Sequence, residues 1–405
     1  MKVLHKILTF IALALMLSLI SCGSKSEIEP PEPPAPPVPN EKAHRTVLVY
    51  MVATNNLGTG VQSFAQNDLD EMVAAAAAGG VGEGRLLVYH VAYSGIVLKE
   101  ITKNGVDTLK VYDNSEPSVP ISRMRAVVAD AKTLAPADEY GIVLWSHATG
   151  WLVDGIAESG SGAAYSFGSD RAKKMNISSL SSALSDAGMA FVYFDCCLMN
   201  TVEVVYQMRD VTPVIIGSDL EVPTDGMPYH LNVPLFFADG DIDYHALAKS
   251  TFDYYDTYRH WDECVNPPLT REEDRTCAMS VIRTADIAEL AAVTREIYST
   301  ATFPAPSSYV PQQFFENGTG LSYYYDWADY VRNIATDADA LSRWEQLLAR
   351  VVTYSESTPR LWDVVDLNVN CGLSTYIFHD EKSALTKGYD RTSWYEDVAS
   401  VLLNK

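Results

Sequence analysis

Basic residues are scarce in this 405-residue chain, which holds 30 lysines and arginines against 52 aspartates and glutamates. The formal net charge is −22 at neutral pH. This excess of negative charge opposes binding to nucleic acid and to anionic lipid headgroups, and it favours basic peptide segments as partners. The length allows roughly two folded units of about 100–200 residues each, or one enlarged unit.

Several catalytic and cofactor-binding signatures are absent. The sequence has no Gly-x-Ser-x-Gly elbow, no Walker loop, no His-Glu-x-x-His motif and no dinucleotide-binding glycine fingerprint. Its six cysteines show no zinc-site spacing with nearby histidines. Calcium is a candidate ligand only because the chain is acidic, since no segment has the ligand pattern of an EF-hand loop. We therefore expect no required cofactor and assign no metal.

Long hydrophobic runs are also lacking, apart from residues 7–20, which are too few to span a membrane as a helix. This run follows Lys2 and Lys6 and leads into Leu-Ile-Ser-Cys, which resembles a bacterial lipobox and ends at Cys22. We expect residues 1–21 to be removed as a signal peptide and Cys22 to carry the lipid that anchors the protein to a membrane. The alternative is an ordinary secretory signal with an incidental cysteine.

The next segment, residues 22–43, holds a proline cluster between Pro30 and Pro39 and almost no apolar side chains. This composition is typical of a semi-rigid polyproline spacer. Such a spacer would hold a folded domain away from the membrane. The predicted location is therefore the bacterial cell envelope, with display on the outer membrane or the cell surface.

Two short apolar runs, residues 141–145 and 191–194, are continuous and rich in β-branched and aromatic side chains. They are typical of interior strands in a parallel sheet. His147 follows the first run, and Cys197 follows the second. Because ligands of open α/β sheets bind beyond the carboxyl ends of the strands, these positions favour chemistry.

A thiol attacks an acyl carbon as its thiolate, and a nearby imidazole can hold that ion pair and later protonate the leaving amine. His147 and Cys197 are therefore candidates for a catalytic dyad. The backbone N–H groups of Ala148 and Cys197 are the natural donors to a developing oxyanion. The alternative for the dyad is a buried thiol and a structural histidine.

Motifs along most of the mature chain resemble the clostripain family of cysteine peptidases, which share the α/β sandwich of the caspase-like clan. The segments that carry the resemblance are VLVYMVATNNL, NDLDEM, SHATGW, DCCLMNTVEV, GSDLEVPTDGMPY and CGLSTYIF. In the fourth segment Asp195 takes the family's Asp and Cys196 stands where Ala is usual, which makes Cys197 the expected nucleophile. Cys196 is then interpreted as a small buried residue that ends the strand.

The resemblance implies a cysteine endopeptidase on a caspase-like α/β/α sandwich with a mostly parallel sheet. Asp195 stands where the family has the carboxylate that binds the substrate's basic side chain. A carboxylate binds a guanidinium bidentately and an ammonium as a point charge, so cleavage after Arg is expected before cleavage after Lys. The alternative for Asp195 is a cap on the helix that starts near Asn200. Trp151, Ser218 and Asp219 are expected to line the same pocket, with a surface carboxylate as the alternative for Asp219.

The chain departs from the family pattern at two positions. Thr54 stands where an Asp is usual, and Ala148 replaces the glycine after the histidine. If position 148 requires positive φ, alanine would strain the loop and displace an oxyanion donor. The alternative to an active enzyme is therefore a catalytically inactive surface lipoprotein that binds basic peptides.

A polar stretch at residues 153–182, rich in serine and glycine, is interpreted as an exposed loop between the two dyad strands. Family members often mature by cleavage between their histidine and cysteine. An enzyme selective for basic residues is therefore expected to cleave itself here, with a solvated basic turn as the alternative. The basic residues of the stretch are Arg171, Lys173 and Lys174.

Beyond the signal peptide and tether, the predicted parts are a catalytic core at residues 44–240 and a helix-rich extension at residues 241–405 that packs on it. Strands are expected at residues 46–53, 85–93, 141–145, 191–194 and 214–217, a hairpin at 96–112, and helices at 61–78, 121–133, 180–187, 252–261, 285–300, 322–334 and 341–354. Cys264 and Cys277 bracket a polar loop. A disulfide between them is a candidate that would stabilise the fold by about 3 kcal/mol in the chain-entropy model.

Overall fold

The computed structural model describes residues 42–60, 63–152, 167–171, 173–256, 276–302, 308–313, 322–361, 365–378 and 388–403. All of them belong to one compact unit, Glu41–Lys405. Within these ranges, no helix is both long enough and apolar enough to cross a membrane. The predicted signal peptide and nearly all of the tether, Cys22 included, lie outside the described residues.

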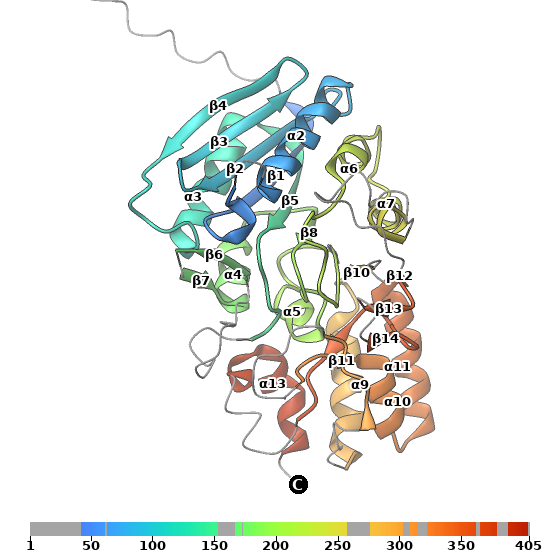
Figure 1. The fold of residues 1–405 in the computed structure, drawn as a ribbon. Helices are drawn as coiled ribbons and strands as arrows, with labels where there is room; N and C mark the ends of the chain where they lie inside the picture. Colours follow the sequence, from blue (N-terminus) through green and yellow to red (C-terminus); the bar gives the residue numbers. More distant parts are fainter. Residues whose placement is uncertain are drawn as a thin grey trace, which may run out of the picture. The chain divides into compact units, whose positions relative to one another are not determined.

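A nine-stranded sheet dominates the described part of the chain, in the order β12-β10-β9-β8-β5-β1-β2-β3-β4 (Figure 1). Its central strands β9, β8, β5, β1 and β2 are parallel neighbours, and the pairs toward both edges are antiparallel. The strands are β1 Ala43–Val52, β2 Arg85–Ala92, β3 Gly95–Thr102, β4 Gly105–Tyr112, β5 Ala137–Trp145, β8 Phe191–Asp195, β9 Val214–Gly217, β10 Ala278–Arg283 and β12 Val352–Ser357. The prediction of a mostly parallel central sheet is confirmed.

Helices cover both faces of this sheet, and each face has its own hydrophobic core. Alternate residues of β1 point to opposite faces. Tyr50 belongs to the core that includes side chains of α3, α4, α5 and the C-terminal helices, whereas Val49 belongs to the core that includes side chains of α2, α6 and α7. The helices are α2 Phe64–Ala77, α3 Ile121–Leu134, α4 Ile177–Leu184, α5 Val202–Gln207, α6 Tyr229–Phe236, α7 Tyr244–Asp256, α9 Ile287–Thr300, α10 Trp327–Ile334, α11 Ala338–Val351 and α13 Ser393–Asp397. Short 3-10 turns are η1 Asn56–Gly58, η5 Tyr389–Arg391 and η6 Ala399–Leu402.

The expected strands and helices of the first half appear close to their predicted bounds, including the β3–β4 hairpin, in which Gly105 follows the turn as the first residue of β4 with a φ of +128°. The loop predicted for residues 153–182 is wrong in its second part. There the chain forms β6 Phe167–Asp170 and β7 Lys173–Met175 as a hairpin, followed by α4. Residues 153–166 lie outside the described part.

The helical prediction for the C-terminal region is partly wrong. Helices α9, α10 and α11 are present, but β10 and β12 extend the central sheet. Residues 352–354, predicted as the end of a helix, are β-branched or aromatic and pair with β10. Tyr325–Asp326 forms the short strand β11, which pairs with β15 Ser374–Thr375, while β13 Arg360–Leu361 pairs with β14 Val365–Asp366.

The parallel strands end at one edge of the sheet, which brings distant parts of the sequence together. The register pairs Met51 of β1 with Trp145 of β5, and Trp145 with Asp195 of β8. The segments that follow β1, β5 and β8 therefore begin side by side. This is the edge at which ligands of open α/β sheets bind.

Candidate active site

A small pocket at this edge is lined by His147, Asp195 and Cys197 and has a volume of about 30 Å³. Its other lining residues come from the turn after β1, the end of β5 and the segment after β9: Leu57, Trp145, Ser146, Val222, Pro223, Thr224 and Gly226. The fold thus brings together three residues that the sequence singled out. The segment at residues 222–226 was not predicted as part of the pocket.

The Cys197 thiol lies against the backbone of Val222. The Val222 N–H donates to Sγ at 3.4 Å, and the thiol faces the Val222 carbonyl oxygen at 3.9 Å. Burial raises the pKa of the thiol to about 12, with the Glu221 and Asp195 carboxylates adding to this effect. The N–H groups of Val222 and of Cys197 itself oppose it. The thiol is therefore protonated near neutral pH and needs a base to become a nucleophile.

The backbone turns sharply directly after Cys197. Leu198 has a φ of +62°, a left-handed conformation that is uncommon for residues other than glycine. Hydrogen bonds hold this turn, from the Leu198 N–H to the Leu220 carbonyl oxygen at 2.8 Å and from the Asn200 N–H to Ser218 O at 2.9 Å. Strained backbone of this kind concentrates at functional sites. The adjacent Cys196 is buried in the core.

The His147 ring is held by a residue that sequence reasoning missed. His147 Nε2 lies 2.7 Å from Asn56 Oδ1, in the turn after β1. Burial lowers the pKa of His147. The only sequence signal for Asn56 was its place in the Thr-Asn-Asn-Leu segment at the end of the first strand, because its contact with His147 depends on the β1–β5 pairing.

The Asp195 carboxylate accepts hydrogen bonds from the segment that closes the pocket. The Met227 N–H donates to Oδ1 and the Tyr229 hydroxyl to Oδ2, both at 2.9 Å. Burial raises the pKa of Asp195 to about 7, against the effect of these two donors. The cap of α5 is Thr201, whose hydroxyl accepts from the Val204 N–H at 3.2 Å, so the capping alternative for Asp195 is wrong.

Further carboxylates surround this position. A Cβ added at Gly226 would lie 3.1 Å from Asp195 Oδ2 and 3.1 Å from Asp68 Oδ2, so the two carboxylates converge on the same wall of the pocket. Asp68 is buried, accepts from Trp145 Nε1 at 2.5 Å, and has its pKa raised by burial and by Asp195. Burial also raises the pKa of Asp225 to about 7. Sequence reasoning assigned no role to Asp68 or Asp225.

The sequence model of the clostripain family, peptidase family C11, matches residues 49–380. The chain belongs to the clostripain family. The predicted membership is thereby confirmed. No curated protein matches the sequence significantly.

Solved structures of C11 proteases resemble the chain over most of its length. The inactive zymogen of a C11 protease from Parabacteroides distasonis is 25% identical, with a TM-score of 0.73 over 88% of this chain and 98% of that chain. A secreted C11 cysteine protease from Bacteroides thetaiotaomicron, in complex with an irreversible peptide inhibitor, is 29% identical. Its TM-score is 0.72 over 88% of this chain and 98% of that chain. A further secreted protease from that organism, iotapain, shares the fold at 22% identity, with a TM-score of 0.73 over 88% of this chain and 99% of that chain.

These likenesses confirm the predicted caspase-like α/β/α sandwich and the prediction of a cysteine peptidase.

The structure shows the surroundings of the two residues that depart from the clostripain pattern. The Thr54 hydroxyl donates to Asp170 Oδ1 at 2.7 Å, so the family's usual Asp at position 54 would face a second carboxylate. Asp170 is fully buried and also accepts from the Ser118 N–H at 2.5 Å.

Ala148 does not occupy a position that demands glycine. Among the residues that the structure describes, only Arg171 and Leu198 combine a side chain with positive φ. In the loop after the histidine, the positive φ of +56° falls at Gly150, where a Cβ would lie 2.7 Å from the Leu198 carbonyl oxygen. The strain expected at Ala148, which favoured an inactive protein, is therefore absent.

Three residues expected in the substrate pocket are not among those that line the Cys197 pocket. Trp151 is fully buried and packs against Tyr376 and Tyr389. The Ser218 hydroxyl accepts from the Leu220 N–H at 3.0 Å within a buried turn. Asp219 is buried and not on the surface, and it accepts from the Asn370 side chain at 3.0 Å. Each of them supports the folded core behind the site, and burial raises the pKa of Asp219 to about 7.

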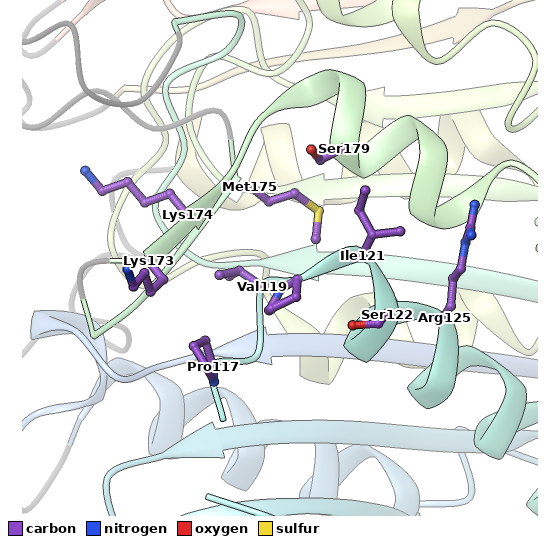
Figure 2. A pocket seen from close by; sticks show the side chains of 10 residues that line it. Pro117, Val119, Ile121, Ser122, Arg125, Lys173, Lys174, Met175 and Ser179 are labelled. Atoms are coloured by element: carbon purple, nitrogen blue, oxygen red, sulfur yellow. The ribbon is translucent and has the colours of Figure 1, made fainter. Parts of the chain in front are cut away.

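The residues predicted for self-cleavage lie in the β6–β7 hairpin. Arg171, at its turn, has a φ of 51° and donates to the Asn114 carbonyl oxygen at 2.5 Å. Lys173 and Lys174 line a separate groove of about 720 Å³ between α3 and the β7–α4 segment, with Arg125 toward its other end (Figure 2). None of the three lines the Cys197 pocket.

The remaining predictions concern the disulfide and metal binding. Cys277 is buried, and Cys264 lies outside the described residues, so the disulfide between them stays a prediction. Within the described ranges, no three His, Cys, Asp or Glu side chains are grouped so that they could hold a metal ion. Calcium therefore remains unassigned.

Proposed function

We propose that this clostripain-family protein is an endopeptidase that cleaves peptide bonds after Arg, and less readily after Lys, with Cys197 as nucleophile and His147 as base. The observation that carries the proposal is the convergence of His147, Asp195 and Cys197 on one pocket. Asp195 supplies the negative charge for the basic side chain, because a guanidinium bound beside it would lower the raised pKa of this carboxyl group.

The reaction follows from the protonation states of the pair. Because the pKa of Cys197 is raised and that of His147 is lowered, both side chains are neutral near pH 7 in this conformation. His147 takes the thiol proton as sulfur bonds to the carbonyl carbon, and the N–H groups of Cys197 and Ala148 stabilise the oxyanion. The protonated imidazole then gives that proton to the leaving amine. Water hydrolyses the thioester and regenerates the thiol.

Binding of the substrate's basic side chain assists the deprotonation of Cys197. Glu221 and Asp195 are among the groups that hold the pKa of Cys197 high. A guanidinium bound to Asp195 would offset that carboxylate's charge and so lower the pKa of the thiol. A cavity of about 30 Å³ is much smaller than an arginine side chain, so its walls must move to admit one.

The test uses residues 40–405 and the Cys197→Ala variant on fluorogenic peptides ending in Arg, Lys or Leu. Release after Arg and Lys that disappears in the variant supports the proposal. Release after Leu alone would contradict the assigned pocket. Absence of turnover on every peptide, with and without reductant and calcium, would instead favour a surface protein that binds basic peptides.

Self-cleavage belongs to the same proposal. Because Lys173 and Lys174 do not line the Cys197 pocket in this structure, a cut in the hairpin requires either local movement or a second molecule. Wild-type protein mixed with the Cys197→Ala variant separates these routes, because cutting of the inactive chain occurs only between molecules. An active preparation that stays a single uncut chain would exclude self-cleavage.

The lipid anchor at Cys22 is the proposed link to the cell envelope. Expression of the full chain in a bacterial host with radiolabelled palmitate tests it, with Cys22→Ser as the matched control. Label on the wild type alone supports the anchor, and label on neither protein contradicts it. Surface protease treatment of the same cells reports whether the catalytic domain is displayed outside.

A further inference from the structure

The side chain that holds His147 determines which of its ring nitrogens is free. Asn56 Oδ1 lies 2.7 Å from His147 Nε2. An amide oxygen can only accept a hydrogen bond, so Nε2 carries the hydrogen and Nδ1 holds the lone pair of the neutral ring. We propose that Asn56 is a positioning residue that fixes this tautomer and reserves Nδ1 for the proton of Cys197. This inference rests on the proposed function of the Cys197–His147 pair.

The turn that presents Asn56 is itself held in place. Asn55 Oδ1 accepts from the Leu57 N–H at 2.9 Å, and Asn55 Nδ2 donates to the Val52 carbonyl oxygen at 3.0 Å. The Leu57 side chain is buried and lines the pocket. On the other side, the Ser146 hydroxyl donates to the same Val52 oxygen at 2.9 Å. The turn and the residue before the histidine are thus both tied to the end of β1, which fixes where Asn56 meets the imidazole.

An uncharged partner suits a base in this environment. Burial lowers the pKa of His147, and an amide orients the ring without adding charge. A carboxylate at position 56 would instead raise the pKa of His147 and favour the imidazolium, which cannot accept the thiol proton. The other titratable groups around the pocket are Cys197 itself and the Asp195 and Glu221 carboxylates, which act on the thiol. Asp68 lies beside Asp195, and Asp225 acts on Asp68. Asn56 is the group that contacts the far nitrogen of the base.

The tautomer is measured directly by ¹⁵N NMR of histidine-labelled protein, with the His147→Gln spectrum used for assignment. The expected wild-type signal is that of the Nε2–H tautomer at pH 7.5. In Asn56→Ala we expect a mixture of the two tautomers. A wild-type ring protonated on Nδ1, or an unchanged tautomer in the variant, would overturn the inference.

The pH dependence of Cys197 alkylation by iodoacetamide gives a second readout that needs no knowledge of the substrate. Asn56→Ala should react about tenfold more slowly at pH 7.5, which is less than the roughly 100-fold that a positioned base contributes at minimum, because the base is still present but no longer held. Asn56→Asp should move the acid limb of the alkylation profile to a higher pH, by roughly one pH unit. Asn333→Ala is the matched control, because Asn333 is exposed and donates to Asp329 of its own helix at 2.7 Å.

Kinetics on the Arg peptide separate positioning from folding. We expect Asn56→Ala to lower kcat with KM unchanged and with a wild-type melting temperature. If the Ala variant is unstable, Asn56→Asp keeps the hydrogen-bond acceptor and carries the test through its pH shift. The Asn56 variants could change the alkylation rate and the tautomer while the wild type cleaves no basic peptide. That result would refute the proposed substrate but would still support the role of Asn56. Variants that match the wild type in all three measurements would refute that role.

Discussion

Two buried carboxylates within one short segment have different neighbours. Asp195 lines the pocket, is exposed to 7%, and lies beside Asp68. Glu203, on α5, is fully buried, and its Oε1 accepts from the Thr375 hydroxyl at 3.1 Å, the Tyr376 N–H at 3.0 Å and the Tyr389 hydroxyl at 2.9 Å. Burial raises the pKa of both.

The difference lies in what surrounds each group. Donors from the C-terminal region gather on Glu203, so its carboxylate ties that region to the helix after the nucleophile. Asp195 instead has other carboxylates nearby, and it lines the same pocket as the Cys197 thiol. Burial alone therefore does not mark a functional carboxylate, and burial next to like charges and beside a cavity is what supports the role proposed for Asp195.

The largest expected effect separates the two adjacent thiols near these carboxylates. Cys197→Ala should abolish peptide cleavage and rapid alkylation by iodoacetamide, because it removes the nucleophile. Cys196→Ala should retain most activity, since Cys196 only fills the core. Turnover on the Arg peptide and alkylation rates for both variants give the comparison. Loss of activity in the Cys196 variant alone would reverse the assignment.

The next effect tests the contrast between the carboxylates themselves. Asp195→Asn should lower kcat/KM on Arg peptides by about 100-fold, which corresponds to about 2.7 kcal/mol and lies within the cost of losing one partner of a buried charge pair. Glu203→Ala should instead lower the free energy of unfolding by about 3 kcal/mol, because three buried donors lose their acceptor. Peptide kinetics and urea unfolding of both variants measure this. The contrast fails if both variants lose specificity or both lose stability.

The pH dependence of stability should sharpen the contrast further. The folded pKa of Asp195, about 7, lies above its usual 3.8, so its favourable contribution is complete below about 3.8 and is lost as the pH rises toward 7. Asp195→Asn removes this loss. The melting temperature of this variant should exceed that of the wild type, and the difference should grow between pH 4 and 8. Each kcal/mol in the free energy of unfolding corresponds to about 2–4 °C. A gap that stays constant with pH would contradict the raised pKa.

The smallest expected effect concerns Glu221, whose carboxylate helps to hold the thiol pKa high. Glu221→Gln removes that charge, so the pKa of Cys197 should fall and alkylation at pH 8 should accelerate by about twofold to fivefold. Glu345→Gln, an exposed change that affects only an ion pair with Arg332, serves as control. Slower alkylation in the Glu221 variant would contradict the predicted direction.

Several features of this protein were determined by the local sequence. The apolar runs ending near His147 and Cys197 predicted interior strands, and the short motifs around them predicted the clostripain family and the caspase-like sandwich. Periodicity and turn residues placed most elements of the first half within a few residues. Such features are readable because helix and strand patterns and motif spacing depend on neighbours in the chain.

Other features were decided only by the tertiary structure. Asn56 meets His147 because β1 and β5 are adjacent, Asp68 meets Asp195 across Gly226, and residues 352–354 join the sheet because β10 offers them an edge. Trp151, Ser218 and Asp219 belong to the right motifs, yet they face the core. Strand order and side-chain direction at the sheet edge follow from contacts between residues far apart in the chain, which no local pattern encodes.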